Sequence, residues 1–318
     1  MACVAAVGGC GAQETLLGTR GSHLFTAMDV LANPGERTAL RAQLRGGDLL
    51  RGRPGCIVRF YRDGRLFKVA ETDADGLAVV SFTPPAPGDT LFTVAVAPIG
   101  LADEPPDPVT LRVACRPRQA PLAVVDLDRT LVATGFDTVL VGTPQPMEGS
   151  QAVLARLART QTIVYLTHRP DYFSLKSKAW LAEHEYPPGP LLLSTLGGFL
   201  KGSGAFKSDA IEALSKRFSK IEIGIGDKIS DAQAYHIHGL RAFLILPRAP
   251  AETPEAMEAL ADELGSLDDR VQVVENWRQV EEALFGKGAY PRSARQRRMK
   301  ERAKTARARA TTTRPVQK

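Results

Sequence analysis

The hydrophobic period of the chain changes once, near residue 120, and this change sets the architecture. Before that point, short runs rich in Val, Phe and Tyr alternate apolar and polar residues, with turn signals about every 8–12 residues. After it, short apolar runs are separated by amphipathic segments of helical length. A period of two predicts strands and a period near 3.6 predicts helices. The sequence therefore predicts an all-β domain followed by an α/β domain.

The first region, residues 29–116, is predicted to be a β-sandwich. It contains Asp63-Gly64 and Asp75-Gly76 between strand-like runs, and Asp-Gly in this setting favours a tight hairpin. We therefore expect two hairpins here. Short strands with regular turns indicate a sandwich of immunoglobulin type, and the segment TDADGLAVVSF resembles immunoglobulin-like modules of bacterial surface and envelope proteins. No catalytic side chains gather in this region, so a structural or docking role is expected.

The second region, residues 117–286, is predicted to be an α/β domain with a parallel sheet. The segment RPRQAP, residues 116–121, is expected to link the two domains, because its prolines interrupt both strand and helix. Strands that alternate with helices form parallel sheets covered on both faces. The strand-like runs are PLAVVDLD, TIVYLTHR, GPLLLST, KIEIGIGD and RAFLILP.

Polar side chains follow several of these runs, where strands of a parallel sheet end and sites form. Asp126 and Asp128 follow the first run, and Thr167 follows the second. Each such residue alone is more typical of a turn, a cap or a solvated surface than of a site. Their joint occurrence favours a phosphatase site. The full set is Asp126, Asp128, Thr167, His168, Arg169, Lys207, Asp227 and Asp231.

These residue types suit phosphoryl transfer. Asp126 can attack phosphorus and form an acyl phosphate, which divides hydrolysis into two easier steps. Asp128 can protonate the leaving oxygen and then activate water. Thr167 and Lys207 can neutralise charge on the phosphoryl oxygens.

Acidic side chains gathered in one pocket would repel each other without a cation. Mg²⁺ prefers oxygen ligands, so we expect it on Asp126 and Asp227. The Asp128 carbonyl and Asp231 would complete or orient the metal shell.

The set resembles the haloacid dehalogenase superfamily at four motifs in the expected order. These motifs are DLDRT, the threonine of YLTHR, the lysine of AFKSD, and GDKISD. The stretch YLTHRPDYFSLKSKAWLAEHEYPPGP is similar to the lipin-like domain shared by lipin phosphatidate phosphatases and retinal-degeneration-B-type phosphatidylinositol transfer proteins. The resemblance implies a Rossmann-like parallel sheet, phosphatidate as substrate, and a phosphate-binding Arg169 beside Thr167 and Lys207. The intervals from Asp128 to Met147 and from Thr167 to Lys207 are too short for a cap domain of usual size, so a capless domain is expected.

Two residues depart from the lipin pattern. Arg129 stands where DxDGT has glycine, and His168 stands where a small residue is usual. Arg129 places a bulky cation beside the nucleophile, where it could contact phosphate or narrow the pocket.

The ends of the chain are predicted to lie outside the folded domains. Residues 1–28 are expected to be disordered. Residues 287–318 carry twelve Lys or Arg and one Glu, which predicts a disordered basic tail that binds an anionic membrane or nucleic acid. Of the four cysteines, Cys56 and Cys115 are expected to be buried free thiols, or one disulfide in an oxidising compartment.

We therefore predict a phosphoric monoester hydrolase that uses Mg²⁺ and an aspartyl-phosphate intermediate on phosphatidate or a related lipid phosphomonoester. The alternatives are a phosphatidate-binding module without turnover and a nucleic-acid-end phosphatase. No apolar run approaches the roughly 20 residues that cross a bilayer, so no transmembrane segment is expected. A peripheral membrane or cytoplasmic location is predicted, with the bacterial envelope as the alternative.

Overall fold

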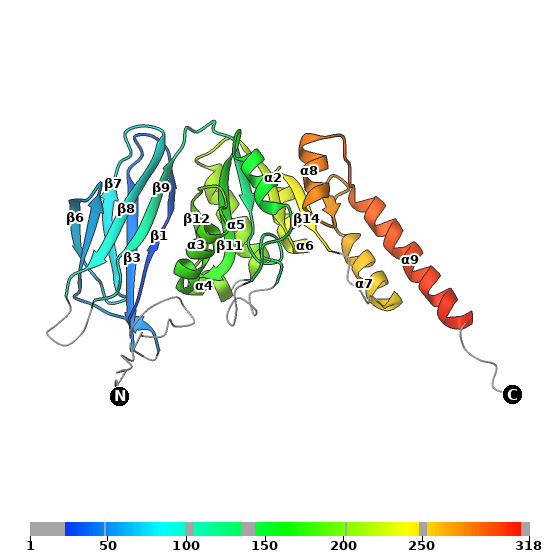
Figure 1. Ribbon diagram of the computed structural model, residues 1–318, viewed down its shortest axis with the longest axis horizontal. Helices are drawn as coiled ribbons and strands as arrows, with labels where there is room; N and C mark the ends of the chain where they lie inside the picture. The colour runs from blue at the N-terminus through cyan, green and yellow to red at the C-terminus, as the bar shows by residue number, and fades with distance from the viewer. Residues whose placement is uncertain are drawn as a thin grey trace, which may run out of the picture.

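The computed structural model describes residues 23–47, 49–98, 105–134, 144–200, 202–247 and 253–312. Figure 1 shows three parts in sequence order: a β-sandwich, a parallel sheet with helices on both faces, and a group of helices at the far side of that sheet. The mixed architecture predicted from the change of period, with a β-rich domain before an α/β domain, is confirmed.

The sandwich consists of two sheets that enclose one apolar core. The first sheet contains β1 (His23–Met28), β3 (Thr38–Gly46), β4 (Arg51–Gly52) and β7 (Leu77–Phe82). The second has the order β2 (Val30–Ala32), β9 (Val109–Cys115), β8 (Gly88–Val96), β5 (Ile57–Arg62) and β6 (Arg65–Glu71). Side chains at alternate positions of both sheets fill the core, with Phe60, Phe92 and Leu40 completely buried.

One of the two predicted hairpins is present. Asp63-Gly64 joins the antiparallel strands β5 and β6, and both residues have positive φ, as a tight two-residue turn requires. The prediction for Asp75-Gly76 is wrong, because β6 pairs with β5 in one sheet and β7 pairs with β3 in the other. Gly76 (φ 75°) passes so close to Leu44 that a Cβ would lie 2.1 Å from its carbonyl oxygen.

The predicted start of the sandwich at residue 29 is wrong by six residues, since β1 begins at His23 and pairs along its whole length with β3. The disorder predicted for residues 1–22, and the cysteines there, lie outside the described residues. Cys56 and Cys115 are buried free thiols, as expected.

The second domain is a six-stranded sheet in the order β12-β11-β10-β13-β14-β15, and every neighbouring pair is parallel. Five strands coincide with the predicted runs, and the three-residue β15 was not predicted. The strands are β10 (Leu122–Val125), β11 (Thr162–Pro170), β12 (Leu191–Ser194), β13 (Ile221–Gly226), β14 (Arg241–Ile245) and β15 (Gln272–Val274).

Helices cover both faces of this sheet. One core joins α2 (Ser150–Leu157), α3 (Ser174–Glu183) and α8 (Trp277–Phe285) to the sheet. The opposite core joins α5 (Ser203–Ser215), α6 (Ile229–Ile237) and α7 (Pro254–Leu264). Two short helices, η1 (Asp171–Phe173) and α4 (Leu196–Leu200), lie in the connections that follow β11 and β12.

The disordered basic tail predicted for residues 287–318 is wrong for most of its length, because Arg292–Thr312 form the helix α9. Met299 and Ala303, one turn apart, are buried, and Met299 belongs to the core that contains α7. Lys300 pairs with Asp262 at 2.8 Å, and Arg307 pairs with Glu258 at 2.6 Å. In Figure 1, α9 runs beside α7 towards the C-terminus. Packing and charge pairing thus stabilise a segment whose composition alone indicates disorder.

Among the described residues, no helix is long and apolar enough to cross a membrane.

Candidate active site

The candidate site begins where β10 ends. The strand order reverses at β10, with β11 on one side and β13 on the other, and such a reversal opens a crevice at the carboxyl ends of the strands. Asp126 follows β10 directly, is buried, and donates its amide to the carbonyl of Ile225 on β13 at 3.0 Å. The backbone pairing of β10 therefore fixes Asp126 at the reversal point.

A tight turn follows Asp126. The amides of Leu131 and Val132 both donate to the carbonyl of Leu127, at 2.8 and 2.9 Å. Arg129 lies in this turn with φ 53°, a left-handed conformation that suits glycine better than arginine. The turn thus needs a left-handed residue at position 129, where the lipin pattern has glycine.

We expect Arg129→Gly to keep the free energy of unfolding unchanged or raise it by up to about 1 kcal/mol, because left-handed strain is relieved while the unfolded chain gains entropy. Denaturant unfolding measures this difference. A loss of more than about 1 kcal/mol would mean that Arg129 makes stabilising contacts that outweigh its strain.

Lys207 lies at the centre of the site. It is completely buried on α5, and its Nζ lies 2.9 Å from Asp126 Oδ2 and also contacts Asp231 Oδ2. Burial would lower the pKa of Lys207, but the negative charge of Asp126, together with that of Asp231, outweighs it and holds the pKa well above its usual range. Lys207 is therefore a fixed cation beside Asp126.

Three carboxylates share this pocket. Asp126, Asp227 and Asp231 each place an oxygen within 4.8 Å of the others. Burial, with repulsion from Asp126 and Asp231, raises the pKa of Asp227 to about 7. The Oδ1 atom of Asp227 is buried without a hydrogen-bond partner, and Ser203 donates to Asp231 at 3.1 Å. The geometry fits a cation that would bind the unsatisfied oxygen and offset the excess negative charge.

Thr167 and Arg169 approach from β11. Thr167 is completely buried, and its hydroxyl oxygen accepts from the Arg169 amide at 3.3 Å. The Arg169 guanidinium donates to both carboxylate oxygens of Asp128, at 2.9 and 2.7 Å, and to the Ser177 hydroxyl at 2.9 Å. Asp128 is thus turned towards Arg169. The phosphate-binding role of Arg169 stays a prediction, since these bonds direct its guanidinium to Asp128 and Ser177.

His168 connects the site to α4. Its ring stacks on Phe199 with centroids 4.8 Å apart, and burial lowers its pKa, which favours the neutral ring. On α4, Phe199 is 37% exposed and Leu200 is 81% exposed. An apolar tip therefore lies next to the residue that follows Thr167.

The structure brings Asp126, Lys207, Asp227 and Asp231 together, and it places Asp128 in a separate ion pair. Sequence reasoning missed Ser203 and Ser177. Ser203 lies one helical turn before Lys207, on the same face of α5, and this spacing could have indicated it. Ser177 has no comparable signal, because only the fold brings it to Arg169.

Several solved structures resemble part of the chain, all with low scores. The CARDB domain of PF1109 from Pyrococcus furiosus is 18% identical and covers 30% of this chain and 95% of its own, with a TM-score of 0.22. The titin M3 domain is 8% identical and covers 30% and 97%, with a TM-score of 0.23. Fibronectin(III)-like modules of Clostridium thermocellum CbhA are 16% identical and cover 30% and 97%, with a TM-score of 0.22.

No curated protein matches the chain. Residues 123–245, which contain every side chain of the candidate site, match the family model of the LNS2 domain of PITM 1-3.

Proposed function

We propose that the chain is a Mg²⁺-dependent phosphatase that works through an aspartyl phosphate on phosphatidate or a related lipid phosphomonoester. The observation that carries this proposal is the cluster of Asp126, Asp227 and Asp231 around the buried Lys207. The match to the LNS2 domain model supports it. The fold would be a capless haloacid dehalogenase-type domain after an immunoglobulin-like sandwich, since in the described part of the interval between β11 and α5 only η1, α3, β12 and α4 are present.

In the first step, a carboxylate oxygen of Asp126 attacks phosphorus, and the bond from phosphorus to the leaving oxygen breaks. Lys207 and the Thr167 hydroxyl neutralise charge on the phosphoryl oxygens. Lys207 already lies 2.9 Å from Asp126, so this cation needs no rearrangement. Mg²⁺ bound by Asp126, Asp227 and Asp231 would neutralise further negative charge there.

Asp128 acts in both steps. In the first, it carries a proton, leaves Arg169, and gives the proton to the leaving oxygen. In the second, its carboxylate takes a proton from water as the water oxygen attacks phosphorus. The bond between phosphorus and the Asp126 oxygen then breaks, and inorganic phosphate leaves.

Two exposed features of the α/β domain support a lipid substrate. One lies on α4 beside the site, and the other lies on α9, which packs on α7 and on β15 at the edge of the sheet. The exposed Phe199 and Leu200 would contact acyl chains. Exposed cations on α9, including Arg297, Arg298 and Lys304, would approach anionic headgroups.

The direct test is phosphate release from phosphatidate in mixed micelles. We expect many turnovers per protein with Mg²⁺ and none after chelation, because the clustered carboxylates would remain uncompensated. The absence of phosphate release with Mg²⁺ would contradict the phosphatase proposal.

One observation favours a second candidate, a phosphatidate-binding module without turnover. The bidentate contact with Arg169 pairs Asp128 as a carboxylate, whereas a general acid must hold a proton. A binding module would retain phosphatidate under the same conditions and release no phosphate.

The apolar tip of α4 gives a further prediction. We expect Leu200→Ser to lower phosphate release from phosphatidate in vesicles by about tenfold or more, because about 1.5–3 kcal/mol of apolar contact is lost. Hydrolysis of a small soluble phosphomonoester should not change. Ile237→Ser is the matched control, since Ile237 is 76% exposed at the end of α6, away from the carboxyl edge of the sheet. Equal vesicle activity of both variants would contradict a role of α4 at the membrane.

A further inference from the structure

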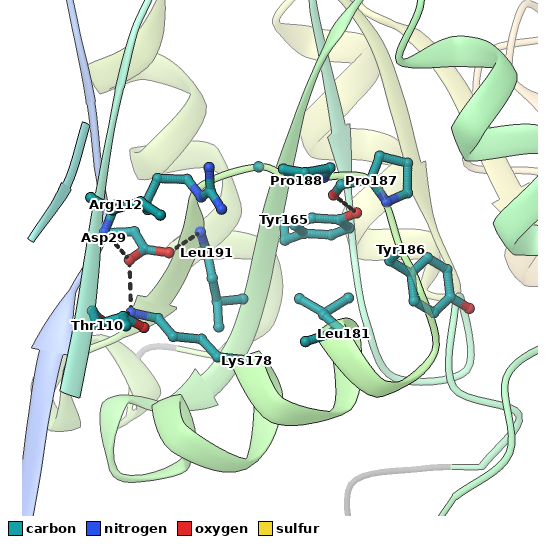
Figure 2. A pocket seen from close by; sticks show the side chains of 13 residues that line it. Asp29, Thr110, Arg112, Tyr165, Lys178, Leu181, Tyr186, Pro187, Pro188 and Leu191 are labelled. Atoms are coloured by element: carbon teal, nitrogen blue, oxygen red, sulfur yellow. Dashed lines mark hydrogen bonds and ion pairs between the residues drawn. The ribbon is translucent and has the colours of Figure 1, made fainter. Parts of the chain in front are cut away.

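The sandwich contacts the α/β domain at helix α3. Lys178 Nζ donates to Asp29 Oδ1 at 2.7 Å and to the carbonyls of Ala27 and Thr110, at 3.0 and 2.9 Å. All three partners belong to the sandwich. Figure 2 shows Lys178 reaching from α3 to Asp29, with the amide of Leu191 bound to the other Asp29 oxygen at 3.1 Å. A single lysine of α3 is therefore held by three oxygens of the other domain.

A second contact holds the segment just before α3. Arg45 of β3 pairs with Asp171 of η1 at 2.9 Å, and both side chains are 7% exposed. The Arg45 guanidinium also lies 4.1 Å from the centre of the Tyr172 ring. Buried charge pairs have strict geometry, because neither partner can turn to water instead. The sandwich thus fixes both η1 and α3.

The held segment carries the groups that orient Asp128. Arg169 lies two residues before Asp171, and Ser177 lies one residue before Lys178. Ser177 is completely buried and accepts from Arg169 Nη1, while Nε and Nη2 bind the Asp128 carboxylate. An unbroken series of contacts therefore runs from Asp29 through α3 and Arg169 to Asp128.

We infer that the β-sandwich positions Asp128, and that Lys178, Ser177 and Arg169 transmit this effect as positioning residues. The catalytic meaning of Asp128 rests on the proposed function, but the mechanical coupling does not. Asp128 needs such support because it lies on a turn after β10, and its side chain is 19% exposed. The planar guanidinium of Arg169 sets both the distance and the plane of the carboxylate.

Two readouts test the coupling, and only one of them requires activity. The first is hydrogen exchange of the amides in residues 126–134. The second is the ratio of turnover on an alkyl phosphate, whose leaving group needs a proton, to turnover on p-nitrophenyl phosphate, whose leaving group does not. Asp128→Asn should lower this ratio by about a hundredfold. This decrease is the value expected when the general acid is lost completely, and the other variants are compared with it.

We compare Lys178→Ala and Ser177→Ala with Arg217→Ala. Arg217 is the matched control, because it also binds the sandwich, through Glu36 at 2.7 Å, and has similar exposure, 31% against 20% for Lys178. We expect both α3 variants to speed exchange in residues 126–134 and to lower the turnover ratio by about tenfold. Arg217→Ala should change neither. Ser177→Ala removes only one hydroxyl. If Lys178→Ala does not fold, this variant still tests the contact of α3 with Arg169, the contact next to Asp128.

Normal exchange and a normal ratio in a folded Lys178→Ala protein would overturn the inference. An effect of Ser177→Ala without one of Lys178→Ala would also overturn it, because the sandwich would then not be involved. Equal effects of all three variants would also overturn the inference, because the variants would then act through general destabilisation. If the wild-type protein releases no phosphate from either substrate, the proposed function fails, and exchange alone decides the coupling.

Discussion

Asp126→Asn should abolish phosphate release from phosphatidate, with a loss of at least about a thousandfold. An amide cannot attack phosphorus as a carboxylate does, so the aspartyl phosphate would not form. The same change removes one of the three carboxylates that could share a cation. No other side chain of the site combines these two roles. Phosphate release under saturating Mg²⁺ and substrate measures the effect.

The fold should survive this substitution. Asparagine has nearly the same size as aspartate, and its amide oxygen could still accept from Lys207, whose other carboxylate partner is Asp231. We expect a cooperative thermal transition at a somewhat lower temperature, because a buried cation loses part of its compensation. Phosphate release within tenfold of wild type would rule out Asp126 as the nucleophile.

Asp227→Asn should make the metal-free protein more stable above pH 7. Burial and neighbouring carboxylates raise the pKa of Asp227 from 3.8 to about 7. The folded state therefore binds a proton that the unfolded state releases, and the stabilising contribution of Asp227 is lost as pH rises through about 7. A neutral amide avoids this loss. The gain in the free energy of unfolding at pH 8 should be on the order of 4 kcal/mol.

Denaturant unfolding at pH 5 and pH 8, with a chelator and then with Mg²⁺, checks this expectation. Mg²⁺ should stabilise the wild-type protein at pH 8 and should stabilise Asp227→Asn less, because one ligand is missing. Asp107→Asn is the control, since Asp107 is exposed. If Asp227→Asn and wild type lose the same stability between pH 5 and pH 8, Asp227 does not titrate in this range.

Local pattern alone determined most of the strands and the place of the site. Period and composition predicted five of the six parallel strands, and a parallel sheet brings its strand ends to one edge. Asp126 and Asp227 could therefore be placed together, because each follows an apolar strand directly. Lys207 followed from its motif. The strands and the two aspartates needed only backbone geometry, which the sequence specifies over a few residues.

Only the tertiary structure decided the partners of β7, α9 and Arg169. Asp75-Gly76 indicates a hairpin, yet β7 completes the other sheet by pairing with β3. The charge of α9 indicates disorder, yet Met299 packs in the core that contains α7. Arg169 lies two residues after Thr167, and only the fold brings Asp128 and Ser177 to its guanidinium; its phosphate-binding role stays a prediction. In each case the deciding contact joins segments that are distant in sequence or on different elements, so no local period or propensity could reveal it.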